Sequence, residues 1–152
     1  MSNDNLWRDT PAGSGGCQCG AVRYTFTAGP SKATICHCRM CQRAVGGPFA
    51  ALLELPRDRI SWAGAPKRFA SSSKADRGFC PECGTPLFYD FHDRDVIEVT
   101  AGSLPPDFPY RPVKQWGMES RCGWLDGLPR LPGAETFETG ISSNQSSEND
   151  GA

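Results

Sequence analysis

The clearest alternation of apolar and polar positions in the chain covers residues 21–27. Its apolar members would share one face of an extended chain, and they are Val22, Tyr24 and Phe26. The polar residues between them would face the other way, which is typical of a strand with one buried face. The sequence therefore predicts a half-buried strand here, ended by the turn-forming residues 29–31, Gly-Pro-Ser.

Further short strands are predicted where apolar runs are separated by Pro, Gly, Asp and Ser. They are expected at residues 33–35, 49–55, 60–62, 67–72, 87–91 and 96–101. A turn of helix is expected from about Arg39 to Val45, closed by the Gly-Gly-Pro of residues 46–48. The 13 prolines and 17 glycines favour many short strands over long helices. We therefore expect a mostly β fold of several small coiled antiparallel sheets.

The 152 residues suffice for one domain with its own hydrophobic core. We expect a flexible lead-in over residues 1–13, a folded domain over 14–137 and a disordered tail over 138–152. The tail is rich in Ser, Asn and acidic residues and has little apolar surface to offset the entropy of ordering.

The charge balance excludes several classes of partner. Sixteen Lys and Arg residues stand against 17 Asp and Glu, so no field gathers nucleic acid or an anionic membrane. No apolar run approaches the roughly 20 residues that span a bilayer, and the N-terminus lacks the pattern of a secretory signal. We therefore expect a cytoplasmic protein. In a reducing compartment, clustered cysteines hold metal more often than they form disulfides.

Seven of the eight cysteines fall into three clusters. The outer two clusters supply four thiols, from Cys17, Cys19, Cys80 and Cys83. The central cluster supplies three, from Cys36, Cys38 and Cys41. Two outer pairs complete one four-thiolate site, whereas the central trio forms a second site that is one ligand short. A closed zinc site is structural and an open one leaves a position for chemistry, with iron–sulfur ligation as the less fitting alternative.

The central trio predicts thiol chemistry. Zinc held by three thiolates carries a net negative charge, which makes it a poor generator of hydroxide and favours an incoming thiol. A thiolate placed there could attack a small carbonyl and form a carbon–sulfur bond. Arg39, Arg43 and Lys32 lie near the trio in sequence and could grip carboxylates of the thiol substrate, although the alternative is that they are solvated surface charges.

Other candidate residues have less specific signals. His37 could ligate zinc, but we expect it to point away or to bond nearby backbone, and we expect His92 at the surface. Cys122 is the unclustered thiol, which is either a small buried residue or a redox nucleophile. Three tryptophans are expected in the core or in a pocket wall, and these are Trp62, Trp116 and Trp124.

Three motifs together resemble the glutathione-dependent formaldehyde-activating enzyme family, which includes the centromere protein V-like proteins. They are GGCQCGAVRY at residues 15–24, CHCRMCQR at 36–43 and FCPECGTPL at 79–87, and the similarity runs to Pro132. The resemblance implies an Mss4-like β fold with one structural and one catalytic zinc. It implies that the four outer cysteines hold the structural zinc, and that the trio holds the catalytic zinc with glutathione sulfur as a fourth ligand.

The same resemblance implies a carbon–sulfur lyase that forms or cleaves S-hydroxymethylglutathione, with glutathione and a small aldehyde as its partners. One departure concerns the family histidine that often precedes the terminal Arg-x-x-Trp region, where this chain has Lys114-Gln115-Trp116. Two alternatives stay open. The protein could be a non-enzymatic zinc-stapled binding module, or a thiol enzyme like the B-type methionine sulfoxide reductases that uses Cys122.

Overall fold

A computed structural model describes residues 5–136 and 139–147, and the remaining positions are outside the described part of the chain. The strands are β1 (Arg8–Thr10), β2 (Gly13–Gly16), β3 (Arg23–Phe26), β4 (Gly29–Cys36), β5 (Ala50–Pro56), β6 (Ile60–Ala63), β7 (Lys67–Ser72), β8 (Ala75–Phe79), β9 (Pro86–Phe91), β10 (Val96–Thr100) and β11 (Lys114–Trp116). The helices are α1 (Arg39–Val45) and the 3₁₀ helices η1 (Arg57–Arg59), η2 (Ala101–Ser103), η3 (Met118–Ser120) and η4 (Gly123–Arg130). The predicted mostly β fold with antiparallel sheets is confirmed.

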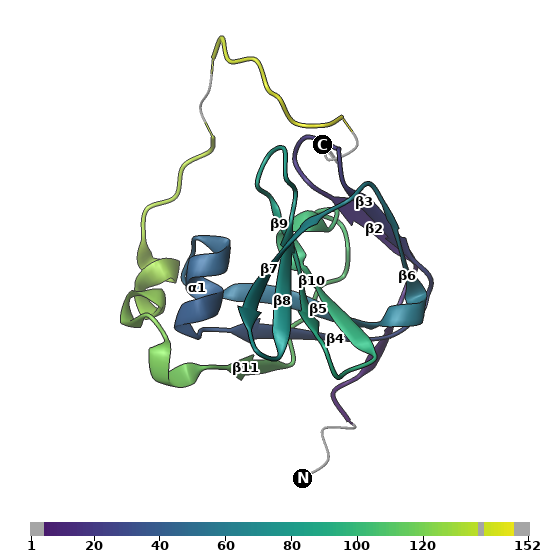
Figure 1. The fold of residues 1–152 in the computed structure, drawn as a ribbon. Coiled ribbons are helices and arrows are strands. Elements are labelled where there is room, and N and C mark those ends of the chain that lie inside the picture. The colour runs from purple at the N-terminus through teal and green to yellow at the C-terminus, as the bar shows by residue number, and fades with distance from the viewer. Residues whose placement is uncertain (1–4, 137–138, 148–152) are drawn as a thin grey trace.

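The strands form two sheets (Figure 1). The large sheet has eight strands in the order β1-β4-β5-β10-β9-β8-β7, with β11 also paired to β4. The small sheet has the order β2-β3-β6. Neighbouring strands are antiparallel except β11 and β4, which run parallel. Most of the strands therefore share a single sheet, which is larger than the sequence led us to expect.

The main core lies between one face of the large sheet and the small sheet. Tyr24 of β3 packs in one buried cluster with Leu53 of β5 and Val99 of β10. Trp62 bridges the sheets, with ring centroids 5.0 Å from Tyr24 and 5.2 Å from Phe88. Burying one apolar side chain of this size, relative to leaving it exposed to water, stabilises the folded state by about 1.5–3 kcal/mol. The alternation predicted for residues 21–27 is confirmed, because its three apolar members are all buried.

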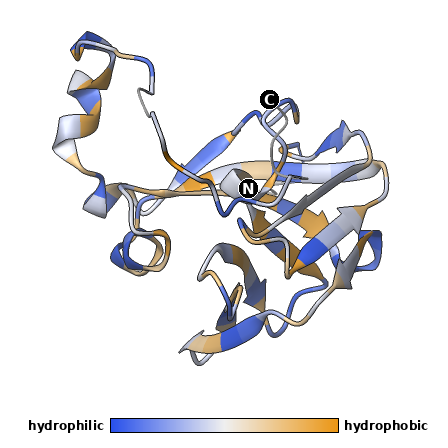
Figure 2. Cartoon of the chain, turned by 90° about the horizontal axis from the view of Figure 1, so that it is seen from above, coloured by the Kyte–Doolittle hydropathy of each residue, from blue (hydrophilic) through white to orange (hydrophobic). Residues whose placement is uncertain are grey.

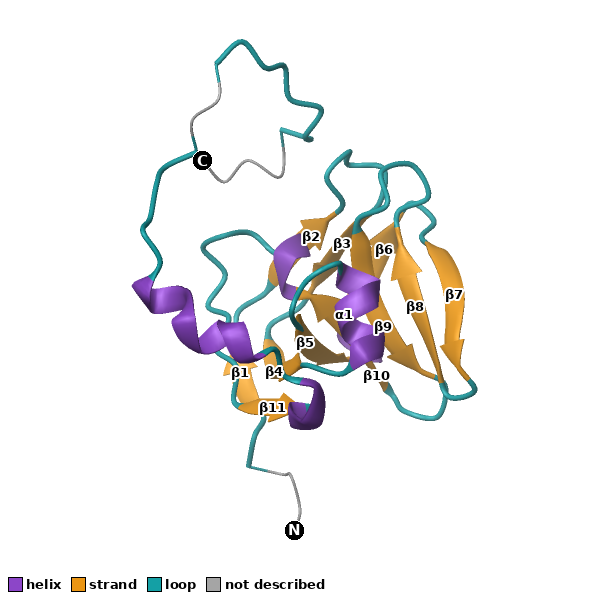
Figure 3. Ribbon diagram, turned by 90° about the vertical axis from the view of Figure 1, so that its left-hand side faces the viewer, coloured by secondary structure: helices purple, strands orange, loops and turns teal. Residues whose placement is uncertain are grey.

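The opposite face of the large sheet forms the second side of the molecule. On β5, Leu53 points into the core whereas Leu52 and Glu54 face a cavity. Figure 3 shows α1 in front of this face, and Cys41 of α1 packs against Leu52. Hydrophobic and hydrophilic bands alternate along several strands in Figure 2, as two-sided packing requires.

Pairing partners create strands that local sequence did not reveal. The expected lead-in contains β1, which pairs with residues 29–31 of β4. Those residues were expected to be a turn, but they begin the longest strand instead. Strand β2 reads Gly-Ser-Gly-Gly and therefore carries no apolar alternation. Gly15 is needed there because a Cβ would lie 2.3 Å from the Tyr24 hydroxyl oxygen.

Residues 139–147 form no helix or strand and run back toward the turn after β2 (Figure 1). The Ser146 amide donates a hydrogen bond to the Gln18 carbonyl at 2.6 Å, and Gln145 Nε2 donates to Gln18 Oε1 at 2.7 Å. The disordered tail expected over 138–152 stays a prediction, and residues 138 and 148–152 lie outside the described residues. Within the described part, no helix has the length and apolarity needed to cross a membrane.

Gly78 of β8 is expected to be essential for packing, because the buried Phe88 ring lies over it. A Cβ at Gly78 would lie 2.0 Å from Phe88 Cε1. We expect Gly78→Ala to lower the free energy of unfolding by about 1–3 kcal/mol, the usual cost of overpacking. Urea unfolding of the metal-loaded protein measures this change. Gly47→Ala is the control, since nothing lies within 4 Å of its added Cβ, and equal midpoints for both variants would contradict the packing.

Candidate functional site

Four thiols meet where the two sheets come together. Cys17 and Cys19 follow β2 of the small sheet, and Cys80 and Cys83 follow β8 of the large sheet. Their sulfurs lie within 4.8 Å of one another, with Cys17–Cys19 and Cys19–Cys80 separations of 3.6 and 3.7 Å. Zinc–sulfur bonds of about 2.3 Å in a tetrahedron separate the sulfurs by roughly 3.8 Å. None of these four described cysteines forms a disulfide, and their arrangement fits a closed zinc site.

Two tight turns give this cluster its shape. The Gly20 amide donates to the Cys17 carbonyl at 3.2 Å, and the Gly84 amide donates to the Cys80 carbonyl at 2.9 Å. Both glycines have positive φ, 82° and 78°, which side chains other than glycine rarely adopt. The Val22 amide also lies 3.3 Å from Cys17 Sγ, a contact that stabilises a thiolate.

The three remaining clustered thiols meet between β4 and α1. Cys36 is the last residue of β4, Cys38 caps the N-terminus of α1, and Cys41 lies in its first turn. The sulfurs lie within 4.8 Å of one another. The Cys38 sulfur accepts the Cys41 amide at 3.4 Å, which satisfies one orphan donor of the helix. The predicted helical turn, closed by Gly46 in the left-handed conformation, is confirmed.

The trio is prepared to lose a proton. The bond with the Cys36 thiol lowers the pKa of Cys41 to about 5, against the opposing effect of burial and with help from Arg77. Arg77 Nη2 lies 3.4 Å from Cys41 Sγ. The same bond raises the pKa of Cys36. Metal binding requires thiolates, so the trio fits a zinc ion as a three-sulfur site. In the described part of the chain no other His, Cys, Asp or Glu joins the trio.

His37 lies outside this cluster, as expected. It is 2% exposed, and its Nε2 is 2.8 Å from Gln115 Oε1, so the amide oxygen accepts from the ring. Gln115 lies in the segment where the resembled family often has a histidine, and in this chain its side chain accepts a hydrogen bond from His37. The Gln42 side chain links the C-terminal segment to the trio, because its Nε2 donates to the His37 carbonyl at 2.7 Å and to the Ser120 carbonyl at 2.9 Å.

Cys122 belongs to neither thiol cluster and is half-buried, with its sulfur 3.8 Å from Gln42 Nε2. His92 is exposed and bonds Asp76, as expected for a surface residue. Trp62 lies in the core and Trp116 lines the cavity described below. Trp124 was expected in the core or a pocket wall, but it is 59% exposed on η4.

A cavity of about 300 Å³ opens beside the trio. Its wall contains charged and hydroxyl side chains that sequence reasoning missed, and these are Thr34, Glu54, Arg77, Tyr89, Arg94 and Glu98. Of the three cations predicted near the trio, Lys32 lines the cavity and pairs with Glu54 at 2.9 Å. Arg39 and Arg43 are exposed on α1 and are not among the lining residues. Thr34 and Lys32 lie two and four residues before Cys36 on the same strand, so the alternation of side chains along a strand could have placed them on the face of Cys36.

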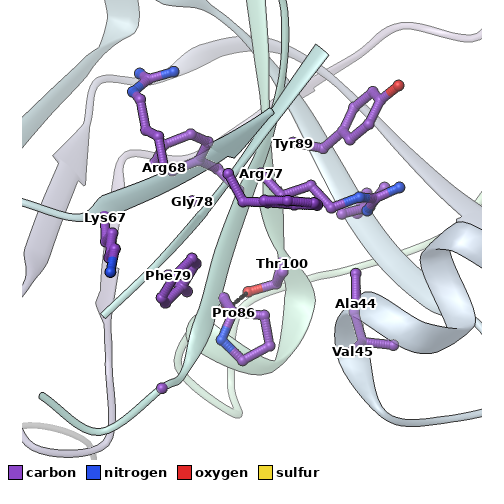
Figure 4. Close-up of a pocket in the computed structure, with 14 residues that line it drawn as sticks. Ala44, Val45, Lys67, Arg68, Arg77, Gly78, Phe79, Pro86, Tyr89 and Thr100 are labelled. Atoms are coloured by element: carbon purple, nitrogen blue, oxygen red, sulfur yellow. Dashed lines mark hydrogen bonds between the residues drawn. The ribbon is translucent and has the colours of Figure 1, made fainter. Parts of the chain in front are cut away.

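A second cavity of about 400 Å³ adjoins the first and is drawn in Figure 4. The two share Leu52, Arg77 and Tyr89 as a common wall. Figure 4 shows the Arg77 side chain extending from its strand toward the helix that carries Ala44 and Val45. The guanidinium lies over the Tyr89 ring, 4.6 Å from its centroid, and its Nε donates to Ser71 Oγ at 2.9 Å. Arg77 is therefore held in place beside Cys41.

Comparison with known proteins agrees with this geometry. An uncharacterized lyase of Schizosaccharomyces pombe is 32% identical over 81 residues, which are 53% of this chain and 59% of that protein. The match thus spans less than two thirds of the relative's length. The crystal structure of a Rhodobacter sphaeroides protein has a TM-score of 0.53 at 21% identity and covers 67% of this chain and 98% of that one. That likeness concerns the fold.

The sequence profile described as glutathione-dependent formaldehyde-activating enzyme matches residues 12–119. This range holds both thiol clusters, and it includes the walls of the cavity beside the trio. The chain belongs to the glutathione-dependent formaldehyde-activating enzyme family.

Proposed function

We propose that the protein is a zinc-dependent carbon–sulfur lyase that forms or cleaves S-hydroxymethylglutathione. The observation that carries the proposal is the trio of thiols at the wall of a cavity, with no fourth His, Cys, Asp or Glu joining it in the described chain. When bound there, zinc would supply a position at which an incoming thiol is held as a thiolate. The family and the lyase-named relative support the same reaction class.

The cavity residues suit a charged peptide thiol. Arg77 lies beside the sulfurs, and Arg94 lies at the more exposed rim. Glutathione carries two carboxylates, which arginine can grip with paired hydrogen bonds. Apolar side chains of Met40 and Trp116 complete the rim and would limit the access of water. The site thus offers both anion binding and a sulfur position within one cavity.

A purely structural role for the central trio receives less support. A closed site would need a fourth protein ligand, and the nearest candidate by sequence, His37, is turned to Gln115 instead. The thiol-reductase alternative would need Cys122 to act as an isolated nucleophile, but Cys122 belongs to neither thiol cluster and is not among the residues that line the cavity beside the trio.

The two thiol clusters should respond differently to loss of one cysteine. We predict two zinc ions per chain at zinc–sulfur distances of roughly 2.3 Å, measured by elemental analysis and X-ray absorption. Cys80→Ser should lower the thermal midpoint by about 10 °C or more. Structural zinc contributes several kcal/mol to the free energy of folding, and each kcal/mol lost lowers Tm by about 2–4 °C. Cys38→Ser should stay folded with one zinc, since serine still caps α1.

Cys122→Ser serves as the matched control and should retain both zinc ions. If Cys80→Ser and Cys38→Ser lose equal stability, the division into structural and catalytic sites is wrong. Iron as the main metal would contradict the zinc assignment for both clusters.

Glutathione should bind the zinc-loaded protein at least about tenfold more tightly than S-methylglutathione, a difference of about 1.4 kcal/mol. The reason is that only the free thiol can give up a proton and place a thiolate beside Cys36, Cys38 and Cys41. Isothermal calorimetry on the wild-type protein compares the two ligands directly. Equal affinities would show that the sulfur makes no special contact, and the proposed function would fail.

Arg94→Ala should weaken glutathione binding about tenfold, because a hydrogen bond to a charged group contributes about 1.5–3 kcal/mol. Arg43→Ala is the matched control, being an arginine removed from the exposed face of α1. Its effect should be small. A larger effect at Arg43 than at Arg94 would show that an arginine of α1 binds the glutathione carboxylate, as the sequence predicted, and would contradict the role of Arg94.

A further inference from the structure

A row of ionisable side chains crosses the face of the large sheet that carries the trio. Five adjacent strands contribute one residue each, and consecutive members stand directly opposite in the strand register: Lys32, Glu54, Glu98, Tyr89 and Arg77. All five line the cavity beside the trio. The row ends at Arg77, whose guanidinium contacts the Cys41 sulfur. It therefore connects the buried carboxyl groups to the place where sulfur chemistry is proposed.

Glu98 is the unusual member of this row. It is 9% exposed, and in the described part of the chain no ion pair joins it to a cation. Its neighbour Glu54 forms an ion pair with Lys32 at 2.9 Å. Glu98 stands directly opposite Glu54 in the strand register, and both carboxyl groups line the same cavity. Burial first, and then the charge on Glu54, raise the pKa of Glu98 to about 8.

We propose that Glu98 carries the proton that moves from sulfur to oxygen during carbon–sulfur bond formation, and back during cleavage. This role rests on the lyase function proposed above. The Glu98 carboxylate takes the thiol proton. The sulfur electron pair then forms a bond to the aldehyde carbon while the carbonyl π pair moves onto oxygen. Protonated Glu98 returns the proton to that oxygen, so glutathione and formaldehyde give S-hydroxymethylglutathione with no other reactant.

The position of Glu98 suits this role. A proton carrier works best when its pKa lies near the working pH, because it must both accept and donate. Glu98 sits on β10, where Ile97 and Val99 are buried in the core on the other side of the strand. The backbone that carries it is therefore fixed. Glu54 and Lys32 are positioning residues, since they act through Glu98 and not on the substrate.

The charges that face Glu98 set the direction of each expected pH effect. They come from β4, β5, β8, β9, the loop before β10 and α1, and they are Lys32, Glu54, Arg77, Tyr89, Arg94 and Cys41. Removing the negative charge at Glu54 removes a cause that raises the proton affinity of Glu98 and leaves Lys32 nearby. The pH at which Glu98 loses its proton should then fall.

The test is the rate of exchange between glutathione and S-hydroxymethylglutathione at equilibrium, measured by NMR with ¹³C-formaldehyde and corrected for the protein-free reaction. Glu98→Gln should lower the protein-dependent rate about 100-fold or more, the usual contribution of general acid–base catalysis. Its zinc content and its affinity for glutathione should match the wild type. Glu54→Gln is the variant to compare with it, because it removes a neighbouring carboxylate and leaves Glu98 in place. It should shift the pH dependence of the rate to lower pH.

A second readout needs no turnover. Infrared spectra of the zinc-loaded wild type should show the carbonyl stretch of a protonated buried carboxylic acid, which fades as the pH rises through about 8. The band should be missing from Glu98→Gln and should fade at lower pH in Glu54→Gln. If Glu98→Gln proves unstable, the shift in Glu54→Gln decides the question.

The outcomes separate the two proposals. Exchange that persists unchanged in Glu98→Gln, or the absence of the infrared band from the wild type, would overturn the role of Glu98 and leave the lyase function standing. A wild-type protein that neither binds glutathione through sulfur nor speeds exchange would overturn the lyase function itself.

Discussion

The structure depends on the two-sided burial of the central strands of the large sheet. Successive side chains on a strand point to opposite faces, so every residue that enters the core fixes the direction of its neighbours. Leu53 of β5 and Val99 of β10 must face the small sheet, and Glu54 and Glu98 are therefore directed to the other side. That side is covered by α1 and closed into a cavity, which is how carboxyl groups become buried beside thiols.

The thiol clusters complete this arrangement at two different places. The outer four cysteines join the turn after β2 to the turn after β8, and so they link the small sheet to the large one across the core. The central trio joins neighbouring segments, the end of β4 and the start of α1, and its sulfurs face the cavity. A metal held by the outer four thiols would therefore tie the two sheets together, whereas a metal held by the trio would lie at the wall of a cavity.

Local signals explain which features the sequence revealed. The helix at Arg39–Val45 and the strand around Tyr24 were predicted because their signals, which are residue spacing, helix-ending glycines and apolar alternation, lie within a few consecutive residues. Strand β2 was missed because its glycines have no side chains to pack and instead lie against side chains of β3, which are Phe26, Tyr24 and Arg23. The cysteines were found as clusters, but Arg77 and Glu98 are brought to the cavity beside the trio by strand pairing between distant segments. Such residues carry no local mark of their role.

The charge on the cavity explains why a proton should reside there. Two ionised carboxylates at Glu54 and Glu98, directly opposite in register and next to a thiolate cluster, would repel one another at low dielectric. Lys32 neutralises the first, and a proton on Glu98 is the least costly way to neutralise the second. Because the pKa of Glu98 is raised in the folded protein, this contribution to stability is lost as the pH rises from about 4.5 to about 8. Raising the pH above about 8 should therefore cost stability at the same carboxyl group that we propose as the proton carrier beside the sulfurs.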